Sequence, residues 1–207
     1  MLSDLKTELQ IDHLLVMYVG NLETYQGVDL LLESFALVLR QTAQVSLVIV
    51  GGEPIDIEKY QRTAAQLNIH AQVHFLGQKP VKDLGLYLSQ ADILVSPRIK
   101  GKNTPMKLYS YLDSGKPLIA TNLLTHTQLL DQRLAVLTEP TPEAFSQGLL
   151  QLIQDETLRL KLGTAGKQFV EQKHTYTAFQ EKLTELYDWL QGEVVSSTAV
   201  SVVRDSA

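Results

Sequence analysis

Short apolar runs alternate with longer amphipathic stretches along this chain, and this alternation is the feature that most restricts the fold. The runs at 14–19 and 46–50 each stop at a glycine, which is typical of strands buried on both faces of a parallel sheet. Between them, residues 28–40 carry apolar side chains at helical spacing. The repetition of this unit predicts an α/β fold with a Rossmann-like, doubly wound and mostly parallel sheet.

The same pattern places the individual elements. We expect strands at 14–19, 46–50, 73–76, 93–95, 118–120 and 134–137. We expect helices at 28–40, 56–67 and 81–88, one after Pro105 that ends near Gly115, and three segments between Pro142 and about Gln191. Ligands of doubly wound sheets bind beyond the carboxyl ends of the strands. The candidate binding loops therefore begin at Gly20, Gly51, Gly77 and Pro97.

The length of 207 residues favours a single domain. We expect residues 1–12 to form a linker with a short helix that leads into the first strand. Residues 13–191 are expected to form the domain that carries the binding loops. Residues 192–207 are expected to be a disordered tail, because the helical spacing of apolar residues is lost there.

Composition argues against several classes of protein. The chain contains no cysteine, so it has no disulfide, no thiolate nucleophile and no thiolate metal site. Its net charge of −5 argues against nucleic-acid binding, which usually needs a basic excess. No apolar run approaches the ~20 residues of a membrane span, and the first residues lack the apolar core of a signal peptide. We therefore expect a cytoplasmic protein.

Neither a metal nor a bound cofactor is expected. The five histidines show no spacing typical of a metal site. The segment Gly20–Gly27 is not the G-x-G-x-x-G fingerprint of nicotinamide and flavin enzymes. Neither a Walker loop nor a Ser-His-Asp set is present. We interpret His126, which follows the fifth expected strand, as a structural or exposed residue, and we assign no catalytic residue.

Three segments of the sequence together resemble a known family. They are the first loop Gly20–Asp29, the run Val95–Leu112, which contains Pro105, Lys107 and Tyr109, and the run Ser114–Thr121. They are similar to the C-terminal domain of family 4 (group 1) retaining glycosyltransferases of the GT-B fold. The similarity extends over 16–189. It implies a donor site for a UDP- or GDP-sugar, and a missing N-terminal Rossmann domain that binds the acceptor, for which a membrane-associated molecule is one candidate.

The binding loops and this resemblance together indicate a set of nucleotide-sugar-binding residues. A helix N-terminus offers free N–H groups to phosphates, and glycines allow a backbone to approach a ligand closely. We expect Asn103 or Thr104 to cap the helix that contains Lys107, with Pro105 in its first turn. The full set is Gly20, Asn21, Gln26, Gly27, Gly51, Gly52, Glu53, Gly77, Gln78, Arg98, Lys102, Asn103, Thr104, Pro105, Lys107, Leu108 and Ser110.

The sequence departs from the family at the charged positions. Where the family has a basic pair in the first loop, this chain has Asn21 and Gln26, and where the family has two glutamates it has Lys102 and Ser110. We hypothesise that Arg98 and Lys102 bind the diphosphate instead, since arginine suits bidentate contacts with phosphate. The alternative is a solvated basic loop. In the same way, Lys107 is either a ligand contact or a surface lysine.

Two functions follow from these observations. The first is the donor-binding part of a glycosyltransferase, inactive on its own. The alternative is a donor-incompetent binding or interaction module, which the neutral and exchanged positions favour; a related sugar-nucleotide enzyme such as an epimerase fits the motifs less well. The late helices carry a run of aromatic and leucine side chains that either covers the core or forms an interdomain surface through which a dimer would form.

Overall fold

The computed structural model describes residues 4–204 of the chain, with side chains for 4–192. The described chain divides into two compact units, one that runs through Gln168 and one that begins at Phe169. The predicted domain over 13–191 thus includes parts of both units, and residues 4–12 belong to the first unit. Each unit is described separately below.

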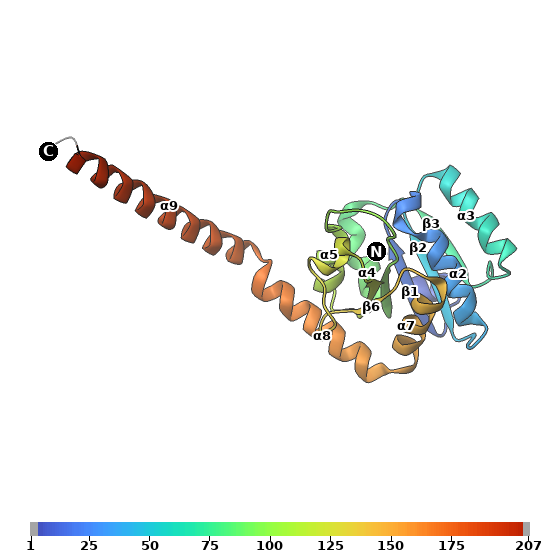
Figure 1. Cartoon of the computed structure of the whole chain (residues 1–207). Coiled ribbons are helices and arrows are strands. Elements are labelled where there is room, and N and C mark those ends of the chain that lie inside the picture. Colours follow the sequence, from blue (N-terminus) through green and yellow to red (C-terminus); the bar gives the residue numbers. More distant parts are fainter. Residues whose placement is uncertain (1–3, 205–207) are drawn as a thin grey trace. The chain divides into compact units, whose positions relative to one another are not determined.

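The first unit is built on one sheet of six strands (Figure 1). The strands are β1 (Leu14–Val19), β2 (Val45–Val50), β3 (Val73–Gly77), β4 (Ile93–Ser96), β5 (Leu118–Thr121) and β6 (Val136–Thr138). All neighbouring strands are parallel, in the order β3-β2-β1-β4-β5-β6. The predicted doubly wound sheet is therefore confirmed. The sixth strand begins at Val136, two residues later than expected.

Helices cover both faces of this sheet (Figure 1). On one face lie α2 (Val28–Leu39), α3 (Pro54–Gln66) and α7 (Pro142–Gln154), with α2 packed against both others. The other face carries α4 (Leu84–Gln90), α5 (Lys107–Asp113) and, of α8 (Glu156–Lys173), the part that runs through Gln168. The short helices α1 (Leu5–Glu8) and α6 (Leu124–Thr127) and the 3-10 turns η1 (Thr24–Gln26) and η2 (Val81–Asp83) occupy connections.

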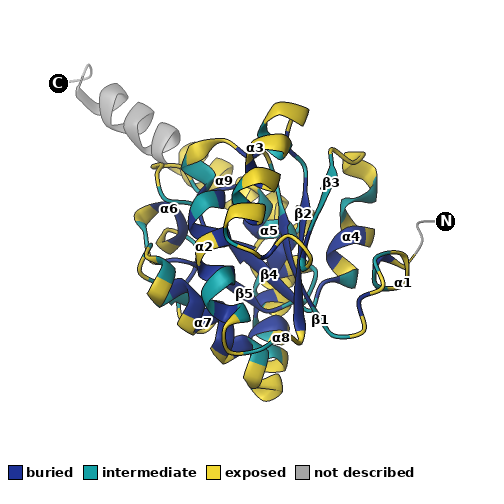
Figure 2. Cartoon of the chain, turned by 90° about the vertical axis from the view of Figure 1, so that its right-hand side faces the viewer, coloured by how far each residue is buried: buried dark blue, intermediate teal, exposed yellow. Residues whose placement is uncertain are grey.

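The core lies on both sides of the central strands (Figure 2). Every residue of β2 is buried, as are the four inner residues of β1. This burial explains why both strands read as continuous apolar runs, because a parallel strand between two helical layers has no solvent face. Tyr18, Phe35 and Phe145 are among the largest fully buried side chains.

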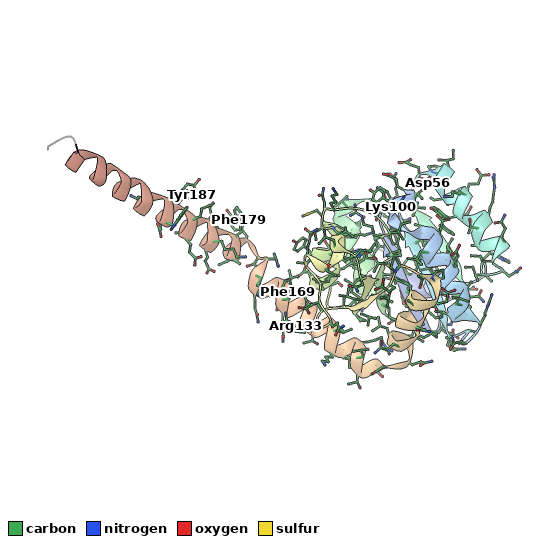
Figure 3. All side chains as sticks on the ribbon, in the orientation of Figure 1. Asp56, Lys100, Arg133, Phe169, Phe179 and Tyr187 are labelled. Carbon is green, nitrogen blue, oxygen red and sulfur yellow. The ribbon has the colours of Figure 1, made fainter. Side chains whose placement is uncertain are left out.

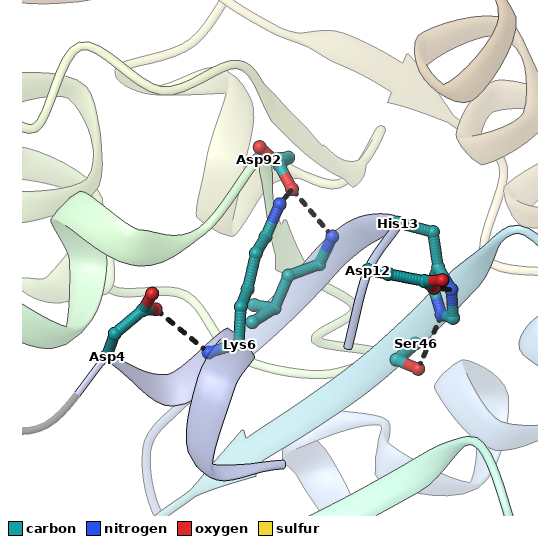
Figure 4. A network of polar contacts seen from close by, with 7 residues as sticks. Asp4, Lys6, Asp12, His13, Ser46 and Asp92 are labelled. Atoms are coloured by element: carbon teal, nitrogen blue, oxygen red, sulfur yellow. Dashed lines mark hydrogen bonds and ion pairs between the residues drawn. The ribbon is translucent and has the colours of Figure 1, made fainter. Parts of the chain in front are cut away.

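Polar contacts at the amino ends of the strands attach the leading helix to the sheet (Figure 4). Lys6 of α1 pairs with Asp92 at 2.7 Å, and the Leu5 side chain is buried. His13 Nε2 lies 2.9 Å from the Ser46 hydroxyl. These groups lie at the edge opposite the binding loops, so we interpret them as structural. The leading helix occupies Leu5–Glu8 of the predicted 1–12 segment, whose first three residues lie outside the described part.

The second unit contains α9 (Tyr176–Arg204). The helix continues through Arg204, so the described part of the segment 192–207, for which we expected a disordered tail, is helical. No proline occurs after Pro142, so nothing in the sequence forces the helix to stop. The remaining part of the predicted tail lies outside the described residues. No helix among the described residues has both the length and the apolarity needed to cross a bilayer.

Candidate functional site

The strand order creates a switch point between β1 and β4. The chain moves outward from β1 to β2 and β3, and then returns to place β4 on the other side of β1. Loops that leave neighbouring strands in opposite directions open a crevice, where ligands of such sheets bind. Here the crevice lies between the loop that begins at Gly20 and the loop that begins at Pro97.

Two glycines allow the loops at this edge to approach closely. A Cβ on Gly27 would lie 2.0 Å from the carbonyl oxygen of Pro97, and one on Gly51 would lie 2.1 Å from that of Gly20. Both have positive φ angles, 75° and 113°, which other residues rarely adopt. These glycines are thus required by loop packing, independently of any ligand.

A cavity of about 510 Å³ opens at the ends of β1, β2 and β3. It brings together the predicted residues Gly20, Asn21, Gly51, Gly52, Glu53 and Gln78. The Gln78 side-chain amide donates to the Glu53 carboxylate at 2.6 Å, which joins the loops after β2 and β3. Gly77 lies just outside, with its carbonyl accepting from the Gly51 N–H at 2.7 Å.

Acidic side chains that the sequence analysis did not select also line this cavity. Glu23 and Asp56 join Glu53 in its wall, and Lys79 is the one cation among its lining residues within the described structure. Asp56 lies in the first turn of α3, where a carboxylate is favoured by the helix dipole. Its place in the first turn of a helix that follows a candidate binding loop is the sequence signal that could have identified Asp56 as a site residue. A diphosphate would be repelled by this wall, whereas hydroxyl groups would find acceptors there.

Glu23 and Asp56 also border a second cavity of about 480 Å³. Its other walls come from Tyr25, from Lys59 of α3 and from the loop residue Lys100. Asp56 and Lys100 are labelled in Figure 3, on α3 and on the loop after β4. The two cavities are therefore adjacent, and Glu23 and Asp56 line both of them.

Lys107 is the most unusual charged group at this edge. Its ammonium lies 4.1 Å from the centre of the Tyr18 ring and 3.4 Å from the Gln26 amide oxygen. A Cβ on Gly20 would come within 3.1 Å of it, so the ammonium borders the glycine that lines the cavity. Among the described side chains, no carboxylate forms an ion pair with it. Burial, and then the charge of Arg98, lowers the pKa of Lys107 to about 7.

Two tyrosines fix the first loop beside this lysine. The Tyr18 hydroxyl donates to the Asn21 carbonyl at 2.6 Å. The Tyr111 hydroxyl accepts from the Val19 N–H at 2.8 Å and lies 3.1 Å from the Val19 carbonyl, to which it donates. Burial raises the pKa of both Tyr18 and Tyr111, so both hydroxyls keep their protons. Sequence reasoning missed both, because a tyrosine in an apolar run reads as core.

Residues 98–103, which we call the cationic loop, place Arg98 differently from the hypothesis. The Arg98 guanidinium donates to the carbonyls of Lys100 (2.8 Å) and Asn103 (3.4 Å) and stacks 4.9 Å from the Tyr25 ring centre. Lys102 is exposed, and its carbonyl accepts from Gln128 at 2.6 Å. Neither Arg98 nor Lys102 lines either cavity. The guanidinium of Arg98 is therefore hydrogen-bonded within its own loop, and its positive charge acts on the site from that position.

The helix after the cationic loop begins later than expected. Helix α5 starts at Lys107, with Met106 at its N-cap and no side-chain cap, so the predicted cap by Asn103 or Thr104 is wrong. The physical reason is that the Asn103 carbonyl is already held by the Thr125 hydroxyl, at 2.7 Å. Pro105 and Leu108 are buried, and Thr104 and Ser110 are partly exposed.

His126 is fully buried between the ends of β4 and β5. Its Nε2 lies 2.9 Å from the Ser96 hydroxyl, and its Nδ1 lies 2.9 Å from both the hydroxyl and the carbonyl of Thr121. Burial lowers the pKa of His126 to about 4, so the ring is neutral at physiological pH. The residues that the structure describes include no group of three or more His, Asp or Glu side chains arranged to hold a metal ion.

Comparisons with known proteins agree with this geometry. The chain is 25% identical over 177 residues to the D-inositol 3-phosphate glycosyltransferase of Corynebacterium diphtheriae, covering 82% of this chain and 41% of that protein. It is 23% identical over 184 residues to the phosphatidyl-myo-inositol mannosyltransferase of Mycobacterium tuberculosis, covering 86% and 47%. The chain thus spans less than half the length of these curated relatives.

Solved structures share the fold. The Anabaena protein HepE, solved in complex with UDP, superposes with a TM-score of 0.80 at 16% identity, covering 89% of this chain and 51% of that one. The sucrose-phosphate synthase of Thermosynechococcus elongatus superposes with a TM-score of 0.74 at 22% identity, covering 93% and 49%. The profile of the family described as "Glycosyl transferases group 1" matches residues 4–169. With most of the chain matched and a sheet of this topology, the protein belongs to the group 1 glycosyltransferase family.

Proposed function

We propose that this chain binds a nucleoside diphosphate sugar, a UDP- or GDP-sugar, at the carboxyl edge of its sheet. It would thereby serve as the donor half of a retaining glycosyltransferase. The observation that carries the proposal is Lys107, an enclosed ammonium without a carboxylate partner among the described side chains, beside the glycine loops of the switch point. A buried cation is costly unless it is paired, so its retention there favours an anionic ligand.

The two ends of the site differ in chemistry, and this difference orients the ligand. The diphosphate would lie at Gly20 and Lys107, where Gln26 and the N-terminal end of α2 after Gly27 add donors. The hydroxyl-bearing parts would lie toward the carboxylates Glu53 and Glu23. Charged hydrogen bonds of this kind contribute about 1.5–3 kcal/mol each. The proposal keeps the other predicted ligand contacts, which would act through their backbone, charge or side chains. They are Asn21, Gly51, Gly52, Gly77, Gln78, Arg98, Lys102, Asn103, Thr104, Pro105, Leu108 and Ser110.

Relatives support the choice of ligand. HepE was solved with UDP and also with UDP-glucose. The curated relatives are named as glycosyltransferases or mannosyltransferases. The proposal needs no metal ion, because Lys107 supplies the positive charge. We also propose a cytoplasmic location, which the absence of cysteine favours.

We further propose that catalysis needs an N-terminal Rossmann-like domain that holds the acceptor. The chain spans less than half the length of these two relatives. One of them is named a phosphatidyl-myo-inositol mannosyltransferase, which favours a membrane-associated acceptor. Helix α9 carries apolar residues at alternating spacings of three and four, from Tyr176 through Phe179 and Leu183 to Leu190. Several are well exposed, including Phe179 (58%) and Trp189 (61%), and Phe179 and Tyr187 are labelled in Figure 3. Without that domain, this face would support dimers, which light scattering would detect.

The test is calorimetric titration of the 207-residue chain with UDP, GDP and their sugars at low salt. We expect one nucleotide to bind, and Lys107→Gln to weaken it by about 10- to 100-fold, the loss of one charged contact. The matched control is Lys161→Gln, which removes an exposed lysine from α8. Equal binding by wild type and Lys107→Gln would contradict the assigned phosphate position.

A second candidate function is a module that has lost donor binding. The specific observation in its favour is the acidic cavity wall formed by Glu23, Glu53 and Asp56, together with the neutral Asn21 and Gln26. Absence of binding by every nucleotide at millimolar concentration would select this function. The same experiment thus separates the two candidates.

A further inference from the structure

A buried histidine lies at the foot of the cationic loop. His126 is 0% exposed and belongs to α6, which follows β5. One ring nitrogen faces Ser96, the last residue of β4, and the other faces Thr121, the last residue of β5. Because both strands end at the edge that carries the site, the ring joins the starting points of two loops.

The partners of this ring determine the direction of each hydrogen bond. The Thr121 carbonyl only accepts, so Nδ1 of His126 carries the proton. The same N–H reaches the Thr121 hydroxyl oxygen at 2.9 Å, which leaves the hydroxyl proton to donate to the Arg98 carbonyl at 2.6 Å. Nε2 then accepts from the Ser96 hydroxyl. One ordered chain thus runs from Ser96 through His126 and Thr121 to the backbone of Arg98.

Two further side chains hold the same loop by its carbonyls. The Thr125 hydroxyl donates to Asn103 at 2.7 Å, and the Gln128 amide donates to Lys102 at 2.6 Å. The cationic loop is therefore held at its start and its end by the segment 121–128. Arg98 lies over the Tyr25 ring and Lys107 over the Tyr18 ring, and the hydroxyls of both tyrosines contact Asn21, so the two cations lie on either side of the first loop. The attachment by segment 121–128 opposes the repulsion between these charges, which also lowers the pKa of Lys107.

We propose that His126 is a positioning residue for the diphosphate site. By orienting the Thr121 hydroxyl it holds the Arg98 carbonyl, and so keeps the charge of Arg98 beside that of Lys107 at the mouth of the crevice. Within the described structure neither Arg98 nor Lys107 forms an ion pair with a carboxylate, and two such cations suit a ligand with two adjacent negative groups. This inference rests on the proposed function and assigns a role to residues that line neither cavity.

The primary test compares two identical substitutions on neighbouring strands. Thr121→Val removes the hydroxyl that holds Arg98. Thr138→Val removes the buried hydroxyl of the residue that pairs with Thr121 in the sheet, and that hydroxyl has no hydrogen-bond partner within the described structure. We expect Thr121→Val to weaken UDP binding by about 3- to 10-fold, the value of a neutral hydrogen bond, and Thr138→Val to leave it unchanged.

Uridine serves as the probe that separates positioning of charge from general loosening. It lacks the diphosphate, so Thr121→Val should bind it as wild type does. His126→Leu should behave like Thr121→Val, and His126→Asn, which keeps a donor near Nδ1, should recover most of the UDP affinity. Gln128→Ala alters an exposed side chain with little risk to folding, and should weaken UDP binding in the same direction.

Two results would overturn the inference. One is unchanged UDP affinity in Thr121→Val and Gln128→Ala while Lys107→Gln has lost it, which leaves the proposed function intact. The other is an equal loss of UDP and uridine binding, which would make the network merely structural. If wild type binds no nucleotide, the proposed function itself fails and this inference fails with it, so the two failures are distinguishable.

Discussion

Replacing Lys107 by methionine should make the protein more stable and weaken its binding of the nucleotide. The ammonium is enclosed by the Tyr18 ring, Gln26 and Gly20, and no carboxylate among the described side chains pairs with it. Methionine has a similar length and no charge, so it removes the unpaired cation and keeps the packing. Ligand sites commonly retain such destabilising groups for function.

The pKa of Lys107 sets an upper bound on the gain. A fall from 10.5 to about 7 corresponds to about 5 kcal/mol, at about 1.36 kcal/mol per pKa unit. Lys107 keeps part of its surface in water, which reduces the penalty, and its contact with the Tyr18 ring recovers some of it. We therefore expect Lys107→Met to raise the free energy of unfolding by about 1–2 kcal/mol at pH 6.5.

Urea denaturation at pH 6.5 and pH 9.5, followed by circular dichroism, measures this difference. Between the folded pKa of about 7 and the unfolded value near 10.5, the unfolded chain binds one more proton, so the penalty decreases as pH rises. The advantage of Lys107→Met should therefore largely disappear at pH 9.5. Lys161→Met, an exposed lysine on α8, should show no such pH dependence. Equal or lower stability of Lys107→Met at pH 6.5 would refute the reasoning.

Three further predictions follow from the same structure. UDP binding should weaken as pH rises from 6 to 8.5, because Lys107 loses its charge above its pKa of about 7; Lys107→Met should have no such profile in calorimetry. Lowering the pH from 6.5 to 4 should reduce the free energy of unfolding by up to about 3 kcal/mol, because His126 binds a proton in the unfolded chain but not in the folded one, where its pKa is about 4. In denaturation curves, His126→Asn should show a smaller change of stability over this pH range. Gly27→Ala should cost about 2 kcal/mol, because its Cβ would meet the Pro97 carbonyl at 2.0 Å, whereas Gly85→Ala, in a helix with open space around it, should add about 0.5–1 kcal/mol; thermal unfolding that ranks them the other way would contradict the packing argument.

Local patterns in the sequence predicted most of the fold. The apolar runs that became β1 and β2 are buried on both faces, so their composition alone identified them. Helix boundaries were harder to predict where a contact with a distant residue decides them. Helix α5 begins at Lys107 because the carbonyl of Asn103, which precedes it, is held by Thr125, a residue 22 positions later in the chain. The helix beyond Gln191 was missed because it lacks the apolar spacing by which a packed helix is recognised.

By itself, the sequence determined a doubly wound sheet with loops at its carboxyl edge, because strand and helix periodicities are local properties that each segment carries. It also predicted the glycines and polar residues that line the cavity after β1, β2 and β3. Only the tertiary structure decided which charges matter. Arg98, predicted to bind phosphate, is engaged by its own loop, and Lys107, which read equally as a surface lysine, is enclosed at the switch point. The enclosure of a charge depends on which distant segments meet around it, and no local pattern encodes that meeting.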